Sequence, residues 1–206
     1  MSDLHKALAD IGNIRVQLAA GTMFRGFGPA VIAASGGLAI MAATAQWAGL
    51  LPAGDANGFL VVWIFVALIA AFFIGVEMRA RSRRRHAGLA DAMLMGAVEH
   101  FLPFGAAGAV IAAILMRNAP DLAWLLPGLW QMLVGLGLFA SVRFLPRTVI
   151  LAAAWYLLAG TAVLAFASAS RSLGPWDMGL PFGIGQLLLA AILHIAEGEA
   201  DGQEDN

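Results

Sequence analysis

The chain of 206 residues contains no cysteine. That absence excludes disulfides, thiolate nucleophiles, cysteine-ligated zinc, iron–sulfur clusters and covalently attached haem. Charge is scarce as well, because only 12% of the residues are Asp, Glu, Lys or Arg, against about 25% in an ordinary soluble domain. Any chemistry must therefore rely on histidine, carboxylate, arginine or backbone groups.

Apolar residues make up 61% of the chain, more than a soluble core can hide. They gather in six runs separated by short polar or glycine- and proline-rich stretches. About 20 helical residues cross the roughly 30 Å hydrocarbon layer of a bilayer. The chain is therefore predicted to be an all-α, polytopic integral membrane protein. Its six transmembrane helices are expected at 27–47, 59–76, 101–116, 122–142, 148–167 and 176–196.

The flanking segments differ from this transmembrane domain, which spans residues 26–196. Residues 1–25 carry Leu and Ile at helical spacing with polar residues between them, which predicts an amphipathic interfacial helix rather than a signal peptide. Residues 197–206 are acidic and contain glycine, and we expect a disordered cytoplasmic tail. Within the domain, the third helix is expected to begin near Asp91, and Pro103 and Pro181 are expected to mark helix entrances.

Basic residues are shared unequally between the two sides of the predicted membrane domain. If the N-terminus and alternate loops lie on one side, only Arg117 and Arg171 of the 12 Lys and Arg residues fall on the other. This asymmetry predicts that both termini are cytoplasmic. The small size and the Arg-over-Lys, Ala- and Gly-rich composition indicate a bacterial inner membrane.

Five arginines follow the second span: Arg79, Arg81, Arg83, Arg84 and Arg85. They predict a topology determinant that contacts anionic lipid headgroups at the bilayer surface. The acidic tail lies on the same predicted side, so pairing between the two is a further hypothesis. Nucleic-acid binding is not expected, because the run is short and lacks interleaved aromatic residues.

Two short segments resemble each other. Leu102-Pro103-Phe104-Gly105 in the third span matches Leu180-Pro181-Phe182-Gly183 in the sixth, and each is followed at the same separation by Ala-Ala-Ile-Leu. In the predicted topology these spans run in opposite directions. The match therefore predicts a 3+3 inverted repeat of the kind found in some transporters. The alternatives are coincidence in a low-diversity apolar alphabet or a common packing solution.

Polar residues deep in the predicted spans are neutral, chiefly Gln131 and Gln186. The lack of a carboxylate at that depth disfavours a proton- or sodium-coupled pump. The two glutamines predict either hydrogen bonds between helices or a polar lining for a small neutral solute.

Four residues lie at the predicted cytoplasmic ends of the third and sixth spans: Glu99, His100, His194 and Glu197. Imidazoles and carboxylates are ligands for zinc, iron or manganese, and two histidines can ligate haem. Convergence of the four would make a metal or haem site. Otherwise they are headgroup-level residues, and the sequence implies no cofactor.

These observations leave three functional hypotheses. The leading one is a non-enzymatic accessory, sensing or scaffold subunit whose partners are the lipid bilayer and either another membrane protein or a second copy of the chain. The alternative is a small-solute transporter or channel built on the inverted repeat. The third is a metal- or haem-dependent membrane enzyme that uses His100 and His194.

Overall fold

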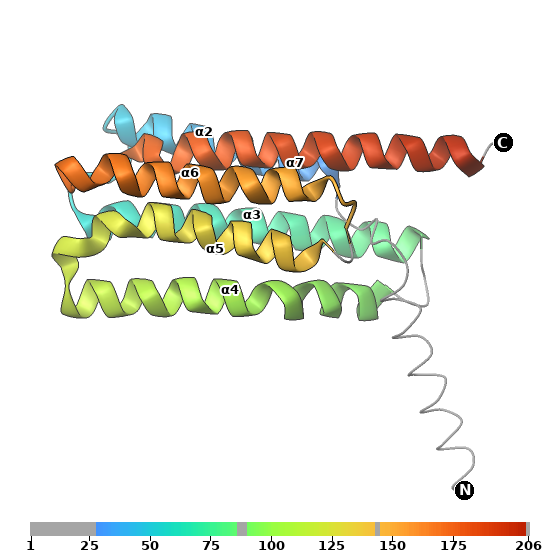
Figure 1. Cartoon of the computed structure of the whole chain (residues 1–206), viewed down its shortest axis with the longest axis horizontal. Coiled ribbons are helices and arrows are strands. Elements are labelled where there is room, and N and C mark those ends of the chain that lie inside the picture. The colour runs from blue at the N-terminus through green and yellow to red at the C-terminus, as the bar shows by residue number, and fades with distance from the viewer. Residues whose placement is uncertain (1–27, 86–89, 143–144, 205–206) are drawn as a thin grey trace, which may run out of the picture.

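The structure, a computed structural model, describes residues 28–85, 90–142 and 145–204, and its regular elements are all helical (Figure 1). Six helices are long and apolar enough to cross a membrane, which confirms the six predicted spans. They are α2 (Pro29–Trp47), α3 (Ala56–Arg85), α4 (Ala90–Asn118), α5 (Leu126–Ser141), α6 (Val149–Ser170) and α7 (Pro175–Glu204). A 3-10 helix, η1 (Pro120–Leu125), joins α4 to α5. The amphipathic helix predicted at 1–25 lies outside the described residues.

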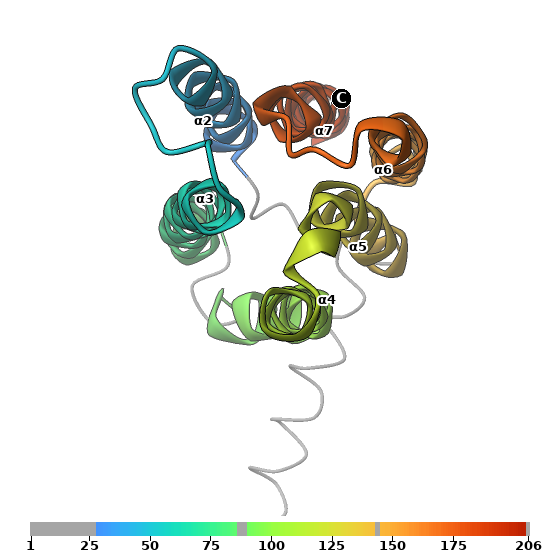
Figure 2. The same ribbon diagram turned by 90° about the vertical axis from the view of Figure 1, so that its left-hand side faces the viewer.

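The helices form a ring in chain order, so that the last helix lies beside the first (Figure 2). The most extensive contacts join α2 to α7 and α5 to α6. We call the end of the bundle that carries η1 and the turn at 171–174 the η1 end. The opposite end, which carries the last turns of α3 and α7 and the start of α6, is the basic end (Figure 1).

Short polar side chains set the starts of two helices at the η1 end. The Gly58 backbone N–H donates to Asp55 Oδ2 at 3.3 Å, so Asp55 caps the first turn of α3. At α7 the direction is reversed, because the Gly174 N–H ahead of the helix donates to Asp177 Oδ2 at 2.9 Å. This is one half of a capping box, and Pro175 takes the first helical position, where a missing N–H costs nothing.

Small residues let the paired helices approach closely. A Cβ atom at Gly36 of α2 would lie 3.0 Å from the carbonyl oxygen of Gly183 in α7. A Cβ at Gly128 of α5 would lie 2.8 Å from the carbonyl oxygen of Gly160 in α6. In a membrane such close backbone approach is the main source of packing energy, because lipid is as apolar as the side chains. These glycines therefore explain why the two pairs are the tightest in the ring.

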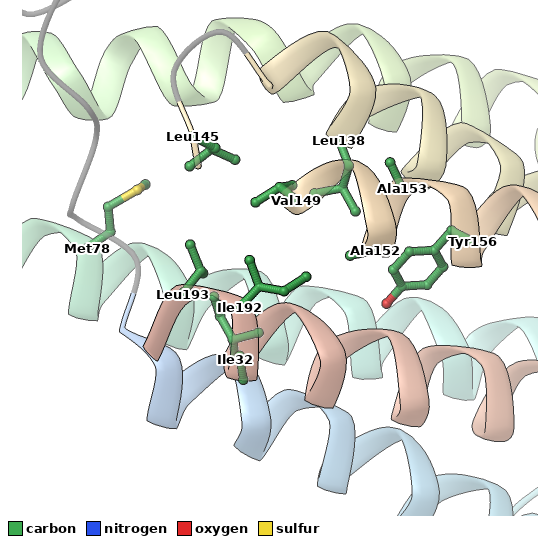
Figure 3. Close-up of a cluster of buried hydrophobic side chains, with 11 residues drawn as sticks. Ile32, Met78, Leu138, Leu145, Val149, Ala152, Ala153, Tyr156, Ile192 and Leu193 are labelled. Carbon is green, nitrogen blue, oxygen red and sulfur yellow. The ribbon is translucent and has the colours of Figure 1, made fainter. Parts of the chain in front are cut away.

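Two apolar clusters fill the bundle, one towards each end. Figure 3 shows the cluster at the basic end, which includes the fully buried ring of Tyr156 together with Ile32, Met78, Leu138, Val149 and Leu193. The cluster towards the η1 end includes Phe59, Trp63, Leu126 and Met178. Phe182 of α7 packs against both clusters.

Three sequence predictions about helix limits meet different outcomes. The start of α4 at Ala90 agrees with the expected start near Asp91. The prediction that Pro103 and Pro181 mark helix entrances is wrong, because both lie inside helices. The helix α7 continues to Glu204, residues 205–206 lie outside the described residues, and the expected disorder of 197–206 stays a prediction.

The structure does not show the inverted repeat. Exchange of the two halves would map the α2–α7 pair onto α4–α5, yet the extensive contacts are α2–α7 and α5–α6. The matched glycines also differ, because a Cβ at Gly105 would meet nothing within 4 Å whereas one at Gly183 would lie 2.5 Å from Ile40 Cδ1. The repeat thus remains a prediction from sequence.

Candidate functional site

Gln131 joins α5 to α7 near the η1 end. Its side chain is fully buried, and its Nε2 donates to the Asp177 carbonyl oxygen at 2.6 Å. In a helix that carbonyl would accept from the N–H four residues later, but the later residue is Pro181, which has no N–H. Gln131 therefore supplies the donor that proline removes. Neighbouring helices commonly satisfy such carbonyls in membrane proteins.

A second side chain crosses to the same stretch of α7. Trp155 Nε1 in α6 donates to the carbonyl oxygen of Pro181 itself at 2.9 Å. Together, Gln131 and Trp155 tie two helices to the first turns of α7. Backbone groups of α7 are thus held by side chains from α5 and α6.

Tyr156 lies next to Trp155 but faces a different part of α7. Its ring is fully buried against Phe182, at a centroid distance of 5.4 Å, and a Cβ at Gly185 would overlap it. The Gln186 side chain is the described polar group placed to pair with the Tyr156 hydroxyl, although no hydrogen bond of good geometry joins the two. A buried hydroxyl without a partner is costly, so this group is a candidate for a ligand or a water molecule.

The two predicted glutamines occupy different levels. Gln186 lies nine residues beyond Asp177 along α7, or roughly 13 Å at 1.5 Å per residue. It is half-buried, and a Cβ at Gly36 would lie 3.0 Å from its Cβ, which places it against α2. Oε1 of Gln131 is buried and accepts no hydrogen bond from the described residues. Gln131 therefore links two helices through its Nε2, and its Oε1 is an acceptor without a hydrogen bond from the described residues.

A buried glutamine also links α2 to α3 by a hydrogen bond at the η1 end. Gln46 is 3% exposed, accepts from Trp63 Nε1 at 2.8 Å through its Oε1, and donates through Nε2 to the Pro52 carbonyl at 2.6 Å. This residue was not among those singled out from the sequence. Its position at the predicted membrane boundary gave no reason to separate it from solvent-exposed glutamines.

At the basic end, one arginine bridges two helices. Arg81 Nε contacts Glu77 Oε1 within α3, and Arg81 Nη1 contacts Glu197 Oε1 of α7, each at 2.8 Å. A Cβ at Gly28, just ahead of α2, would overlap the Glu77 side chain, so the start of α2 also packs on this cluster. The predicted pairing of the arginine run with the acidic tail is realised at Arg81 and Glu197.

The other predicted rim residues are dispersed. Glu99 and His194 are exposed, and they lie on α4 and α7, which Figures 1 and 2 place on opposite sides of the bundle. His100 is in α4, but its side chain is outside the described part of the structure. Among the described residues, no three His, Asp or Glu side chains are placed to share a metal ion. Glu197 instead pairs with Arg81.

The remaining arginines of the run are at the end of α3. Arg79 is exposed, and the structure does not describe the side chains of Arg83, Arg84 and Arg85. Their common position at the basic end agrees with the dense positive charge that the sequence predicts there.

The residues that sequence reasoning missed are Gln46, Trp155, Tyr156 and Asp177. Each acts through a contact between two helices, and such contacts join positions from 17 apart, for Gln46 and Trp63, to 46 apart, for Gln131 and Asp177. The proline in the last span was the available signal, because it implies a carbonyl that needs a donor from elsewhere.

The six apolar helices define a multi-pass membrane protein. Comparison with known protein families, curated proteins and solved structures finds no match for this chain.

Proposed function

We propose that the chain is a non-enzymatic accessory or scaffold subunit of a bacterial inner membrane. This proposal is supported by the contacts of polar residues that the sequence singled out, because these residues hold helices together. Gln131 satisfies the Asp177 carbonyl, and Glu197 pairs with Arg81. Groups that hold helices together in this way serve the stability of the bundle, which is what a scaffold requires.

The proposed orientation places the basic end and both termini in the cytoplasm. Its support is the concentration of arginine at the end of α3, the pattern that governs topology in bacterial membranes. The arginines of the run would contact anionic headgroups, each contributing about 1 kcal/mol near the surface.

Native mass spectrometry of the tagged protein extracted from its own membrane tests the scaffold proposal. We expect a second polypeptide in fixed stoichiometry. The recombinant chain alone in nanodiscs is the control, because it reports only what the chain does by itself. Recovery of the chain without a second polypeptide, combined with solute flux through reconstituted vesicles, would overturn the proposal.

A small-solute transporter is the second candidate, favoured by two buried polar atoms. Oε1 of Gln131 has no hydrogen-bond partner among the described residues, and the Tyr156 hydroxyl has no hydrogen bond of good geometry to the Gln186 side chain beside it. A small neutral solute could exchange hydrogen bonds with these groups. Urea and glycerol flux into proteoliposomes tests this candidate, with Tyr156→Phe expected to reduce flux if the hydroxyl takes part. Metal analysis and an absorption spectrum of the same preparation test the metal or haem hypothesis.

A further inference from the structure

The connection between α2 and α3 presents large apolar side chains at the η1 end. Trp47, the last residue of α2, is 71% exposed, and Leu50 is 79% exposed. Leu51 and Pro52 are exposed as well. We call residues 47–52 the apolar loop. Viewed along the bundle, the connection bows outwards from α2 and α3, away from the centre of the ring (Figure 2). The loop therefore lies at the periphery of the molecule.

A hydrogen-bonded turn holds the backbone of this loop. The Gly49 N–H donates to the Gln46 carbonyl at 3.1 Å, and the Leu50 N–H donates to the Ala45 carbonyl at 2.8 Å. These two bonds are those of a Schellman motif, and Gly49 has the left-handed conformation that the motif requires, with φ at 74°. In this motif the residue after the glycine commonly packs back on the helix. Leu50 is nevertheless exposed, so it is presented outwards by a hydrogen-bonded turn.

The buried side chain of Gln46 fastens the other end of the loop. Its Nε2 donates to the Pro52 carbonyl at 2.6 Å, and its Oε1 accepts from Trp63 Nε1 of α3 at 2.8 Å. The last turn of α2, the apolar loop and α3 are thus linked through one residue. Backbone groups that are satisfied within the protein lower the cost of placing a loop at the edge of the hydrocarbon layer.

The length of α2 sets the level of the loop in the membrane. Its 19 residues span roughly 28 Å at 1.5 Å per residue, close to the thickness of about 30 Å of a hydrocarbon core. Trp47 ends this span, so it lies at the boundary of the bilayer on the η1 side. Tryptophan is enriched at this level because its ring is apolar and its N–H is polar.

The surface of the loop continues the exposed face of α2. Exposed residues recur along this helix at intervals of three or four positions: Ala34, Gly37, Met41, Thr44 and then Trp47. The Thr44 hydroxyl donates to the Ile40 carbonyl of its own helix at 2.8 Å, so it is satisfied without water. Because α2 packs on α7 and α3 through its other faces, this face borders on lipid in the chain by itself. The apolar loop begins where that face ends.

We propose that the apolar loop inserts into the boundary between headgroups and acyl chains at the η1 end and anchors α2 there. Its partner is the phospholipid bilayer that surrounds the chain. Residues 47–54 contain no charged residue, so the contact depends on burial of apolar side chains rather than on headgroup charge. Such an anchor fixes the depth and tilt of the span that it ends. This proposal goes beyond the scaffold function, and it depends neither on that function nor on which side the η1 end faces.

Spin labels on single cysteines test the proposal, because the chain has no cysteine of its own. Leu50→Cys and Ser172→Cys are labelled separately, and each chain is placed alone in phosphatidylcholine nanodiscs. Ser172 is the matched control, because it is exposed in the turn at 171–174 at the same end. Oxygen partitions into lipid, whereas a nickel chelate stays in water. We expect the oxygen-to-nickel accessibility ratio to be several-fold higher for Leu50→Cys than for Ser172→Cys.

Two results of this experiment would overturn the proposal. Equal ratios at the two positions would place the loop in water. A label at Leu50→Cys that is protected from both oxygen and nickel would show that protein, such as a second copy of the chain, covers the loop. Because the chain is alone in the nanodisc, either result leaves the test for a second polypeptide in native membranes unaffected.

Removal of the neighbouring apolar side chains tests whether the loop inserts through its own residues. In the spin-labelled Leu50→Cys chain, Trp47→Ser combined with Leu51→Ser should raise nickel accessibility towards the Ser172→Cys value, because apolar area is lost. Asn57→Ser exchanges one exposed polar residue for another in the first turn of α3, and it should leave nickel accessibility unchanged. If the Trp47→Ser and Leu51→Ser substitutions also leave it unchanged, the loop is carried at that level by α2, and it is not an anchor.

Discussion

The Gln131 side chain donates to the Asp177 carbonyl oxygen at 2.6 Å and thereby replaces the backbone donor that Pro181 lacks. A proline inside a transmembrane helix is tolerated when a neighbour satisfies the carbonyl it leaves open. Here the neighbour comes from α5, in the other tight helix pair. The bond therefore couples the integrity of α7 to the position of α5.

A double-mutant cycle should detect this coupling. Gln131→Leu removes the donor and leaves the Asp177 carbonyl unsatisfied, whereas Pro181→Ala restores an N–H within α7. We expect Gln131→Leu to cost less in the Pro181→Ala background, with a coupling free energy of about 1 kcal/mol, the scale of hydrogen bonds between membrane helices. Equilibrium unfolding in mixed micelles measures all four variants.

In the control cycle, Trp155 is mutated instead of Pro181. The hydrogen bond from Trp155 to the Pro181 carbonyl does not involve the missing N–H. The Gln131→Leu and Trp155→Phe substitutions are expected to be closer to additive. If Gln131→Leu costs as much in the Pro181→Ala background as in the wild type, the glutamine does not replace the backbone donor.

Sequence patterns predicted the helices better than their contacts. Six apolar runs gave six spans because hydrophobic length is a property of each segment alone. Pro181 was misplaced at a helix entrance because its tolerance depends on Gln131, a residue distant in sequence. Two partners were predicted for Glu197, a metal ion and an arginine. The choice of Arg81 follows from the positions of α3 and α7, which the sequence does not reveal. Partner choice depends on tertiary packing, which residue spacing does not contain.

Adjacent glycines in α2 should respond oppositely to the same change. A Cβ at Gly36 would lie 3.0 Å from the Gly183 carbonyl, whereas a Cβ at Gly37 would meet nothing within 4 Å. Gly36→Val adds a branched side chain to this close contact, so we expect destabilisation by about 1–3 kcal/mol from overpacking. Gly37→Val should be neutral or stabilising, because almost any residue is a better helix former than glycine. Thermal unfolding in detergent gives the comparison, and equal shifts in melting temperature would contradict it.

Arg81 is expected to stabilise the basic end modestly. Arg81→Ala removes contacts to Glu77 and Glu197 and leaves two carboxylates side by side. All three side chains retain some exposure, between 19% and 35%, so solvent screening limits the loss to about 1 kcal/mol.

Arg81→Lys is the informative control, because one ammonium group does not reproduce the fork that bridges the two carboxylates. It should restore only part of the melting temperature lost in Arg81→Ala. The difference between wild type and Arg81→Ala should also shrink at high salt, where exposed ion pairs are screened. A difference that does not change with salt would mean that Arg81 acts by packing its aliphatic stem rather than through its charge.

The proposed orientation makes opposite predictions for the two ends of α3. Asn57 is exposed in the first turn, at the η1 end, and Ser82 lies near the last turn, at the basic end. Because the arginines cluster at the basic end, that end should face the cytoplasm. A membrane-impermeant maleimide should therefore label Asn57→Cys in intact cells but label Ser82→Cys only after permeabilisation, against a cysteine-free background. Labelling of both sites in permeabilised cells is the control for reactivity. If Ser82→Cys is labelled in intact cells and Asn57→Cys is not, the basic end faces outwards, and the arginine run does not determine the topology of this chain.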